Sequence, residues 1–180
     1  MNFESVGPEG LVIIQPRIFS DERGAFMETF NEKQFLDAGL PIHFFQDNES
    51  ISAKGVLRGL HFQKPPYEQG KLVRVVHGSA LDVAVDIRKN SRTYGRHFKI
   101  VLDAKQPQFF FIPPGFAHGF LALEENTVFL YKCTTPYNPS AEGTLAWNDP
   151  DLNIDWGISH PALSTKDMKG KSFSNFLSPF

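Results

Sequence analysis

The sequence is poor in features that define several common protein classes. It has one cysteine, Cys133, which excludes an internal disulfide and a metal site built from cysteines. No apolar run approaches the roughly 18 residues of a membrane span, and the first residues lack the basic and apolar regions of a signal peptide. We therefore expect a cytoplasmic protein in which Cys133 is a small buried side chain.

An excess of charge of either sign is also missing. The 18 basic and 20 acidic residues give a formal net charge of −2 and are spread along the chain. This balance argues against nucleic acid or an anionic membrane as a partner, so an anionic ligand would need a local cluster of cations. Glycine-rich phosphate loops, a Gly-x-Ser-x-Gly elbow and Cys-x-x-Cys pairs are absent too, which excludes the usual nucleotide-hydrolase, dinucleotide, serine-hydrolase and thiol-redox sites.

Aromatic and turn-forming residues are plentiful. The 180 residues include 18 phenylalanines, 14 glycines and 13 prolines, a composition typical of many short strands joined by tight turns in one domain. We predict an all-β antiparallel sandwich or barrel with few short peripheral helices. Two early strands are expected, an opening one over 11–14 and 17–19 that is interrupted at Pro16 and a second at 26–30. Later strands are expected at 44–52, 56–63, 72–77, 80–88, 97–103, 108–112, 119–123, 128–134 and 144–147.

Local patterns make two of these expectations specific. Residues 32–38 favour a short helix, with Asn31 as its N-cap and Phe35 and Leu36 as its apolar face. In the strand 80–88, aliphatic residues at 81, 83, 85 and 87 alternate with residues that include Asp82 and Asp86. This alternation predicts one core face and one polar face.

The strand 56–63 carries Arg58 and His61 within an apolar run. Residues three apart face opposite sides of a regular strand, so both can line one pocket only if Gly59 marks a bulge or bend. The same parity separates Lys71 from Arg74, and we expect only Lys71 to enter the pocket. An arginine and a lysine near a histidine suit an anionic, carbonyl-bearing ligand.

A Pro-x-Gly-x-x-His turn at 113–118 resembles half of the cupin signature, in which His118 would point into the mouth of the barrel. The other half requires His-x-His followed by glutamate, whereas this chain has His61-Phe62-Gln63. Two candidate ligands make a metal site improbable. The inward histidines then have either a general-base role or a structural one.

Ordered blocks of residues resemble one family, the dTDP-4-dehydrorhamnose 3,5-epimerases, between about residues 16 and 167. These blocks lie at 45–48, 56–63, 70–74, 82–88, 113–120, 130–132 and 138–143. The resemblance implies a homodimer of cupin-like domains that needs neither metal nor cofactor. It implies inversion of C3 and C5 of a dTDP-linked 4-keto-6-deoxyhexose on the route to dTDP-L-rhamnose.

The resemblance also implies roles for individual residues. His61 would be the base, Asp167 would hold its other ring nitrogen, Lys71 would lie near the C4 oxygen, and Tyr131 would donate a proton on the opposite sugar face. Tyr137 would stack on thymine, although Pro136 departs from the family pattern there. The implied substrate-binding residues are Arg23, Phe26, Glu28, Gln46, Asp47, Asn48, Arg58, His118, Tyr137, Glu142 and Lys166.

The resemblance further implies a division of the single domain at 1–180. A core barrel would span about 44–147, strands within 11–30 would lie at the dimer interface, and residues 148–180 would fold back over the barrel. The apolar opening strand supports a dimer because an unpaired edge of that kind is a liability. Three alternatives stay open: a single-centre epimerase, a sugar-binding cupin domain without activity, and a metal-dependent cupin dioxygenase.

Overall fold

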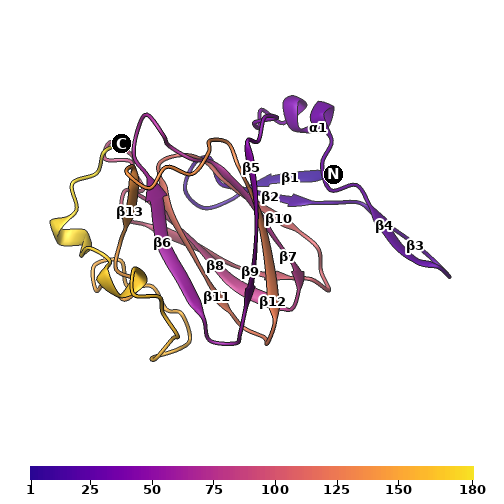
Figure 1. Ribbon diagram of the computed structural model, residues 1–180. Coiled ribbons are helices and arrows are strands. Elements are labelled where there is room, and N and C mark those ends of the chain that lie inside the picture. The colour runs from indigo at the N-terminus through magenta and orange to yellow at the C-terminus, as the bar shows by residue number, and fades with distance from the viewer.

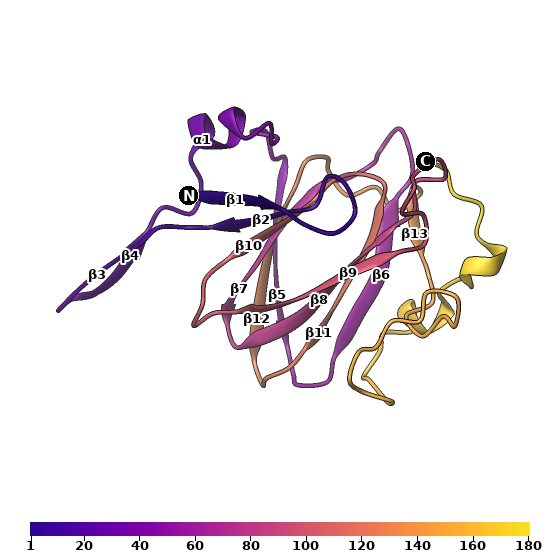
Figure 2. The same cartoon turned by 180° about the vertical axis from the view of Figure 1, so that it is seen from behind.

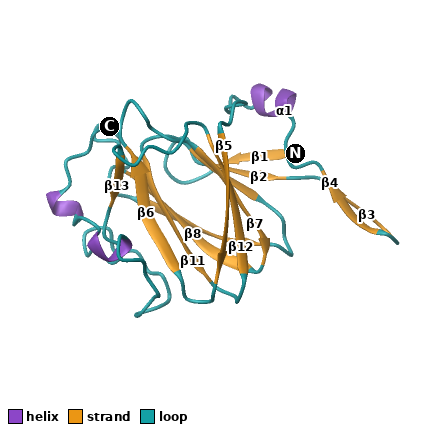
Figure 3. Ribbon diagram, viewed as in Figure 1, coloured by secondary structure: helices purple, strands orange, loops and turns teal.

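The computed structural model describes all 180 residues, and its regular secondary structure is almost entirely antiparallel strands, most of them in two facing sheets (Figures 1 and 3). This confirms the predicted all-β class. The six-stranded sheet has the order β1 (Asn2–Ser5), β2 (Val12–Gln15), β10 (Phe109–Ile112), β7 (Lys71–His77), β12 (Thr127–Cys133) and β5 (Gln46–Ser52). The five-stranded sheet has the order β13 (Glu142–Thr144), β6 (Leu57–Gln63), β11 (Phe116–Ala122), β8 (Ser79–Asp86) and β9 (His97–Asp103).

A third, two-stranded sheet is the hairpin of β3 (Ile18–Asp21) and β4 (Gly24–Met27). It extends away from the sandwich on the side opposite the C-terminal segment (Figure 2). Its apolar side chains are exposed, including Phe26 at 69%. No helix in the structure is long and apolar enough to span a membrane.

The space between the two sheets is filled by large aromatic side chains. Phe110 and Phe129 from the six-stranded sheet are fully buried and pack with Phe116 and Phe120 from β11. The rings of Phe120 and Phe129 stack with centroids 4.0 Å apart. Alternation along each strand sends these rings inward, so burial of aromatic surface holds the sheets together.

Strand β8 corrects the prediction of one core face and one polar face. Val83, Val85 and Ile87 face the outside of the five-stranded sheet, where they pack against Trp156 and other residues of the C-terminal segment. Ala80 and Ala84 face the interior, and Asp82 and Asp86 are fully buried with them. The prediction failed because the polar face is turned toward the opposite sheet while the C-terminal segment covers the aliphatic face, which makes β8 a central strand buried on both sides.

The short helix α1 (Glu32–Asp37) begins as predicted, because the Asn31 side chain accepts a hydrogen bond from the Gln34 N–H at 3.0 Å. Its apolar face is narrower than predicted. Phe35 is fully buried among other aromatic rings, whereas Leu36 is 61% exposed. A helix of fewer than two turns presents only one residue to the sheet, and the next residue points about 100° away.

Several strand boundaries also differ from those predicted. Strand β11 begins at Phe116, directly after the Pro113-Pro114-Gly115 turn, three residues earlier than expected. Strand β13 covers 142–144 instead of 144–147, and β4 ends at Met27 instead of residue 30. Strand β1 was not predicted, because Asn2–Ser5 has a single apolar residue and forms through pairing with β2.

Candidate active site

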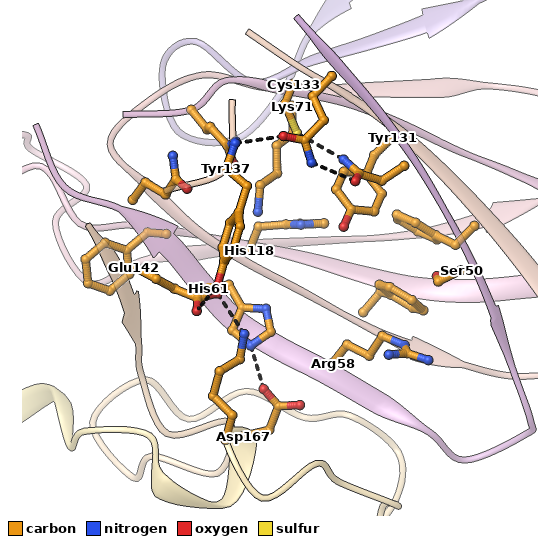
Figure 4. Close-up of a pocket in the computed structure, with 18 of the residues that line it drawn as sticks. Ser50, Arg58, His61, Lys71, His118, Tyr131, Cys133, Tyr137, Glu142 and Asp167 are labelled. Carbon is orange, nitrogen blue, oxygen red and sulfur yellow. Dashed lines mark hydrogen bonds and ion pairs between the residues drawn. The ribbon is translucent and has the colours of Figure 1, made fainter. Parts of the chain in front are cut away.

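A pocket of about 510 Å³ opens between the two sheets and beside the C-terminal segment (Figure 4). Side chains reach it from β5, β6, β7, β11, β12 and β13, from the loop after β12, and from residues 164–167. Of the residues proposed from the sequence, it is lined by Gln46, Asn48, Arg58, His61, Lys71, His118, Tyr131, Tyr137, Glu142, Lys166 and Asp167.

Strand β6 delivers both Arg58 and His61 to this pocket through the expected irregularity at Gly59. His61 pairs with His118 and Arg58 pairs with Phe120, so β6 has one more residue than β11 between these pairs. Gly59 has φ of +140°, and a Cβ there would lie 2.5 Å from the Gly119 Cα. Only glycine fits this backbone conformation and this close approach.

The His61 ring is held by a residue far away in the sequence. Its Nε2 lies 2.5 Å from Asp167 Oδ1, and Asp167 Oδ2 accepts a 2.7 Å hydrogen bond from the Ser164 hydroxyl. Burial lowers the pKa of His61, the Asp167 hydrogen bond opposes this, and Lys166 and Lys71 lower it further. His61 is therefore neutral at pH 7, with its Nδ1 lone pair unoccupied by any group of the chain.

The Asp167 carboxyl is ionised despite its burial. Burial acts to raise its pKa, but hydrogen bonds from His61 and Ser164 more than offset this, so the pKa lies below its ordinary value of 3.8. A buried carboxylate next to one imidazole nitrogen fixes the tautomer of the ring and stabilises the imidazolium formed when the ring accepts a proton. The His61–Asp167 pair can thus act as a general base.

Lys71 and Tyr131 reach the pocket from the opposite sheet, on β7 and β12 (Figure 4). The Lys71 ammonium has no hydrogen-bond or ion-pair partner in the chain, and burial lowers its pKa. Burial raises the pKa of Tyr131, so its hydroxyl keeps its proton at neutral pH. The pocket therefore places a base on one wall and an unpaired cation and a phenolic acid on the other.

His118 faces the same pocket from β11 and has a buried partner that sequence reasoning missed. Its Nε2 lies 2.8 Å from Asp82 Oδ2 on the neighbouring strand β8. The second oxygen of Asp82 is buried and makes no hydrogen bond. The alternation along residues 80–88 placed Asp82 on the polar face, and only the packing of the two sheets turns that face inward, where a buried aspartate requires a partner.

Three side chains form a cluster at one end of the pocket. Glu142 accepts hydrogen bonds from Lys166 Nζ at 2.7 Å and from the Tyr137 hydroxyl at 3.0 Å. Burial opposes ionisation of Glu142, but these two partners hold its pKa below its ordinary value. Tyr137 is also held by its own N–H, which donates to the Gln46 side chain at 2.7 Å.

Four predicted binding residues lie away from this pocket. Arg23 and Phe26 are on the projecting hairpin, where Arg23 pairs with Asp21, and Glu28 accepts a hydrogen bond from Gln34 just beyond it. Asp47 points to the outer face of β5 and pairs with Lys132 at 2.9 Å. Strand alternation explains Asp47, because Gln46 and Asn48 on either side of it point inward. Arg74 is also outside the pocket, as expected, with its guanidinium 5.2 Å from the Phe109 ring centre.

Other pocket residues were not predicted. Strand alternation could have identified five of them. Ser50 follows Gln46 and Asn48 at the same spacing, Phe129 and Cys133 flank Tyr131, and Gln63 and Phe120 lie two residues after His61 and His118. The other three had no local signal: Phe62, Gln69 and Ser164. Nowhere does the chain bring together three His, Cys, Asp or Glu side chains in an arrangement that could hold a metal ion.

Comparisons with known proteins point to one family. A family model described as dTDP-4-dehydrorhamnose 3,5-epimerase matches residues 7–175. The enzyme of that name from Methanothermobacter thermautotrophicus is 55% identical over 91% of this chain and 89% of its own length. The crystal structure of the enzyme from Elizabethkingia anophelis superposes with a TM-score of 0.93 at 46% identity, covering 97% of both chains. The Legionella pneumophila 3,5-epimerase, solved with dTDP-4-keto-L-rhamnose, has a TM-score of 0.92 at 44% identity, covering 97% of this chain and 93% of its own.

Proposed function

The chain belongs to the dTDP-4-dehydrorhamnose 3,5-epimerase family, and from this premise we propose how its own residues perform the reaction. The substrate is dTDP-4-dehydro-6-deoxy-D-glucose, and the product is dTDP-4-dehydro-L-rhamnose for dTDP-L-rhamnose biosynthesis. The observation that carries the proposal is the His61–Asp167 pair facing Lys71 and Tyr131 across one pocket. Both C3 and C5 are adjacent to the C4 ketone, so one set of groups can serve both centres.

His61 removes the proton. The electron pair of the C–H bond moves toward the C4 carbonyl, which becomes an enolate, and His61 becomes an imidazolium. Asp167 supports this step because its carboxylate stabilises the positive ring. The lowered pKa of His61 keeps the ring unprotonated and ready at neutral pH.

Lys71 stabilises the enolate. Its ammonium has no partner in the chain and lies in the pocket wall opposite His61, so it can approach the C4 oxygen. A preorganised cation in a partly buried site offsets the charge that develops on that oxygen. His118, which is paired with His61 in the five-stranded sheet, is a second polar contact for the sugar.

Tyr131 returns a proton to the opposite face of the sugar. Inversion requires removal from one face and delivery to the other, and Tyr131 comes from the sheet opposite His61. Its raised pKa keeps the hydroxyl protonated until it donates the proton to the enolate. Before the second centre reacts, the Tyr131 phenolate recovers a proton from solvent and the His61 imidazolium releases its proton to solvent.

The nucleotide lies toward the cluster of Tyr137, Glu142 and Lys166. Tyr137 is half-exposed at this end and offers a ring for thymine, and Lys166 offers an ammonium for the diphosphate. Gln46, Asn48 and Arg58 also line the pocket and provide further hydrogen bonds to the substrate.

We further propose a homodimer in which the β3–β4 hairpin reaches the partner's pocket. The hairpin leaves its own sandwich and exposes Ile18, Phe19 and Phe26. Arg23 on the hairpin and Glu28 just after it do not line the pocket of their own chain. An exposed apolar hairpin of this kind is well suited to cover a second copy, which would then receive Arg23, Phe26 and Glu28.

Hydrogen exchange tests the reaction directly. The protein is incubated with dTDP-4-dehydro-6-deoxy-D-glucose in D2O without added metal, and deuterium at C3 and C5 is followed by NMR. We expect exchange at both positions. Exchange at one centre alone would indicate a single-centre epimerase, and no exchange at either would refute the proposal.

A variant tests the base. His61→Ala should abolish exchange while binding of dTDP, measured by calorimetry, stays within about twofold of the unmodified protein, because the nucleotide end of the pocket is untouched. Unchanged exchange would remove His61 from this role.

A further inference from the structure

Residues 171–180, which we call the aromatic strap, follow Asp167 closely in the sequence and pack on the outer face of the five-stranded sheet (Figure 1). The strap carries Phe173, Phe176 and Phe180. The rings of Phe176 and Phe180 lie with their centroids 5.4 and 6.4 Å from that of Phe62. Phe62 is the residue directly after His61, so the strap packs against the strand that carries the base.

Phe62 also connects the strap to β13. Gly143 is paired with Phe62, and a Cβ on Gly143 would lie 2.2 Å from the edge of the Phe62 ring. The next pair in the same ladder is Thr144 with His61. Movement of the Phe62 ring would therefore disturb both neighbours of His61, along its own strand and across the ladder.

The strap is attached at both of its ends. Near its start, Lys171 forms a parallel bridge with Leu145, and the Phe173 N–H donates to Asp149 at 2.7 Å. Near its end, the Ser178 hydroxyl donates to the Ile87 carbonyl, and the Lys89 N–H donates to the Phe180 carbonyl at 3.1 Å. These attachments lie across the outer face of the sheet. Phe176 lies between the two sets of attachments, and Phe180 is the last attached residue.

Asp167, by contrast, sits on a short element. It begins η1 (Asp167–Lys169), a single 3-10 turn, and its N–H donates to the Ser164 hydroxyl at 3.1 Å. Such a turn has little stability of its own and takes its position from the contacts on either side. Upstream these are the contacts with Ser164 and the bridge that joins Ala162 to Val56, and downstream they are those of the strap.

We propose that the aromatic strap is a positioning element for the base: Phe176 and Phe180, packed on Phe62, hold Asp167 in register with His61. The inference rests on the proposed role of the His61–Asp167 pair. The family model matches residues 7–175, so Phe176 and Phe180 lie beyond the residues that it matches. A shift of about 1 Å at a catalytic group can lower the rate by two orders of magnitude, so modest loosening is measurable.

The test compares Phe176→Ala/Phe180→Ala with Leu177→Ala, a control in the same segment whose side chain is 92% exposed. Initial rates of exchange at C3 and C5, measured over a range of substrate concentrations with the whole chain, give kcat and KM. We expect the double variant to lose kcat about tenfold with KM within about twofold, and the control to match the unmodified protein. A double variant with unmodified kcat would overturn the inference.

A double-mutant cycle with Asp167→Asn separates positioning from general loosening. If the strap acts through Asp167, removal of the two rings should cost much less in the Asp167→Asn background than in the unmodified one. Equal losses in both backgrounds would overturn the inference. If the alanine variant does not fold, Phe176→Leu/Phe180→Leu keeps most of the apolar volume and undergoes the same cycle.

The same data distinguish failure of the strap from failure of the proposed function. An unmodified protein without exchange would refute the function itself, and an Asp167→Asn variant with unmodified kcat would refute the role of the pair. The strap inference alone is refuted when Asp167→Asn is impaired and the ring variant is not.

Discussion

Asp82 and His118 lie side by side on neighbouring strands, with 2.8 Å between Asp82 Oδ2 and His118 Nε2, and both side chains are buried. The imidazole N–H is thereby directed at a carboxylate, and Nδ1 is left without a partner in the chain. The pair is the second histidine–aspartate contact of the pocket, after His61 and Asp167. Since Lys71 and His118 both face the sugar region, the Asp82 charge acts on the side where the enolate oxygen would form.

We expect Asp82→Asn to lower kcat while the fold is kept. The amide oxygen can still accept from His118, but the charge is lost, and a charge-assisted hydrogen bond is worth about 1.5–3 kcal/mol. The corresponding loss in kcat is roughly 10- to 100-fold, with a smaller change in KM. Steady-state kinetics measure it, and Asp37→Asn on the exposed surface of α1 is the control. An unmodified kcat would show that the Asp82 charge is irrelevant to the reaction.

As the pH is lowered, kcat/KM should begin to fall only below pH 6.5, the ordinary pKa of a histidine. Burial lowers the pKa of His61, so the ring stays unprotonated, and able to accept a proton, to a more acidic pH than a free imidazole. The pH dependence of kcat/KM measures this value for the free enzyme. An acid limb above 6.5 would contradict the assignment.

Tyr131→Phe should separate proton removal from inversion. His61 and Lys71 are unchanged, so an α proton can still be removed and replaced from the same face, and deuterium should enter the substrate in D2O. Delivery from the opposite face requires the lost hydroxyl, so we expect product formation to fall roughly 100-fold or more. NMR follows both quantities in one sample. Loss of both in equal measure would indicate that Tyr131 has a binding role instead.

Asp86 should contribute a pH-dependent part of the stability. The buried carboxylate accepts hydrogen bonds from Arg88, Ser91 and Thr93, which offset its burial and lower its pKa from 3.8 to about 2. A lowered carboxyl pKa stabilises the folded state above the unfolded value, and this stability is lost as the pH falls from about 4 toward 2. At 1.36 kcal/mol per pKa unit, the contribution is about 2 kcal/mol.

Urea unfolding of Asp86→Asn and of the unmodified protein between pH 7 and pH 2 tests this. The variant should be less stable by at least about 2 kcal/mol at pH 7, and the difference should shrink toward pH 2. Asp37→Asn serves again as the exposed control. A difference that does not change with pH would mean that Asp86 acts through shape alone.

Local patterns were sufficient for most elements of the fold. The alternation in β8, the turn signals before β6 and β11, and the Asn31 cap of α1 each depend on neighbouring residues only. Predictions failed where burial is decided by distant segments. Leu36 is exposed because α1 packs only Phe35 against the sheet. The polar face of β8 is buried because the opposite sheet covers it.

The pocket divides in the same way. Arg58 and His61 could be placed on one side through Gly59, because strand parity is a local property. Ser50 and Cys133 follow the same rule and could have been added. Asp82 could be identified only once it was known that β8 lies next to the strand of His118. Arg23 and Phe26 are on the β3–β4 hairpin and do not line the active-site pocket of their own chain.

The sequence by itself determined that this chain forms strands and which side chains share a face, because both depend on backbone geometry that repeats every two residues. Only the tertiary structure decided that Asp167 meets His61, 106 residues away, and that Lys71 and Tyr131 face them from the other sheet. The physical reason is that a catalytic contact of this kind is made by packing between segments, here the C-terminal segment on the five-stranded sheet, and no local periodicity encodes which segments will pack together.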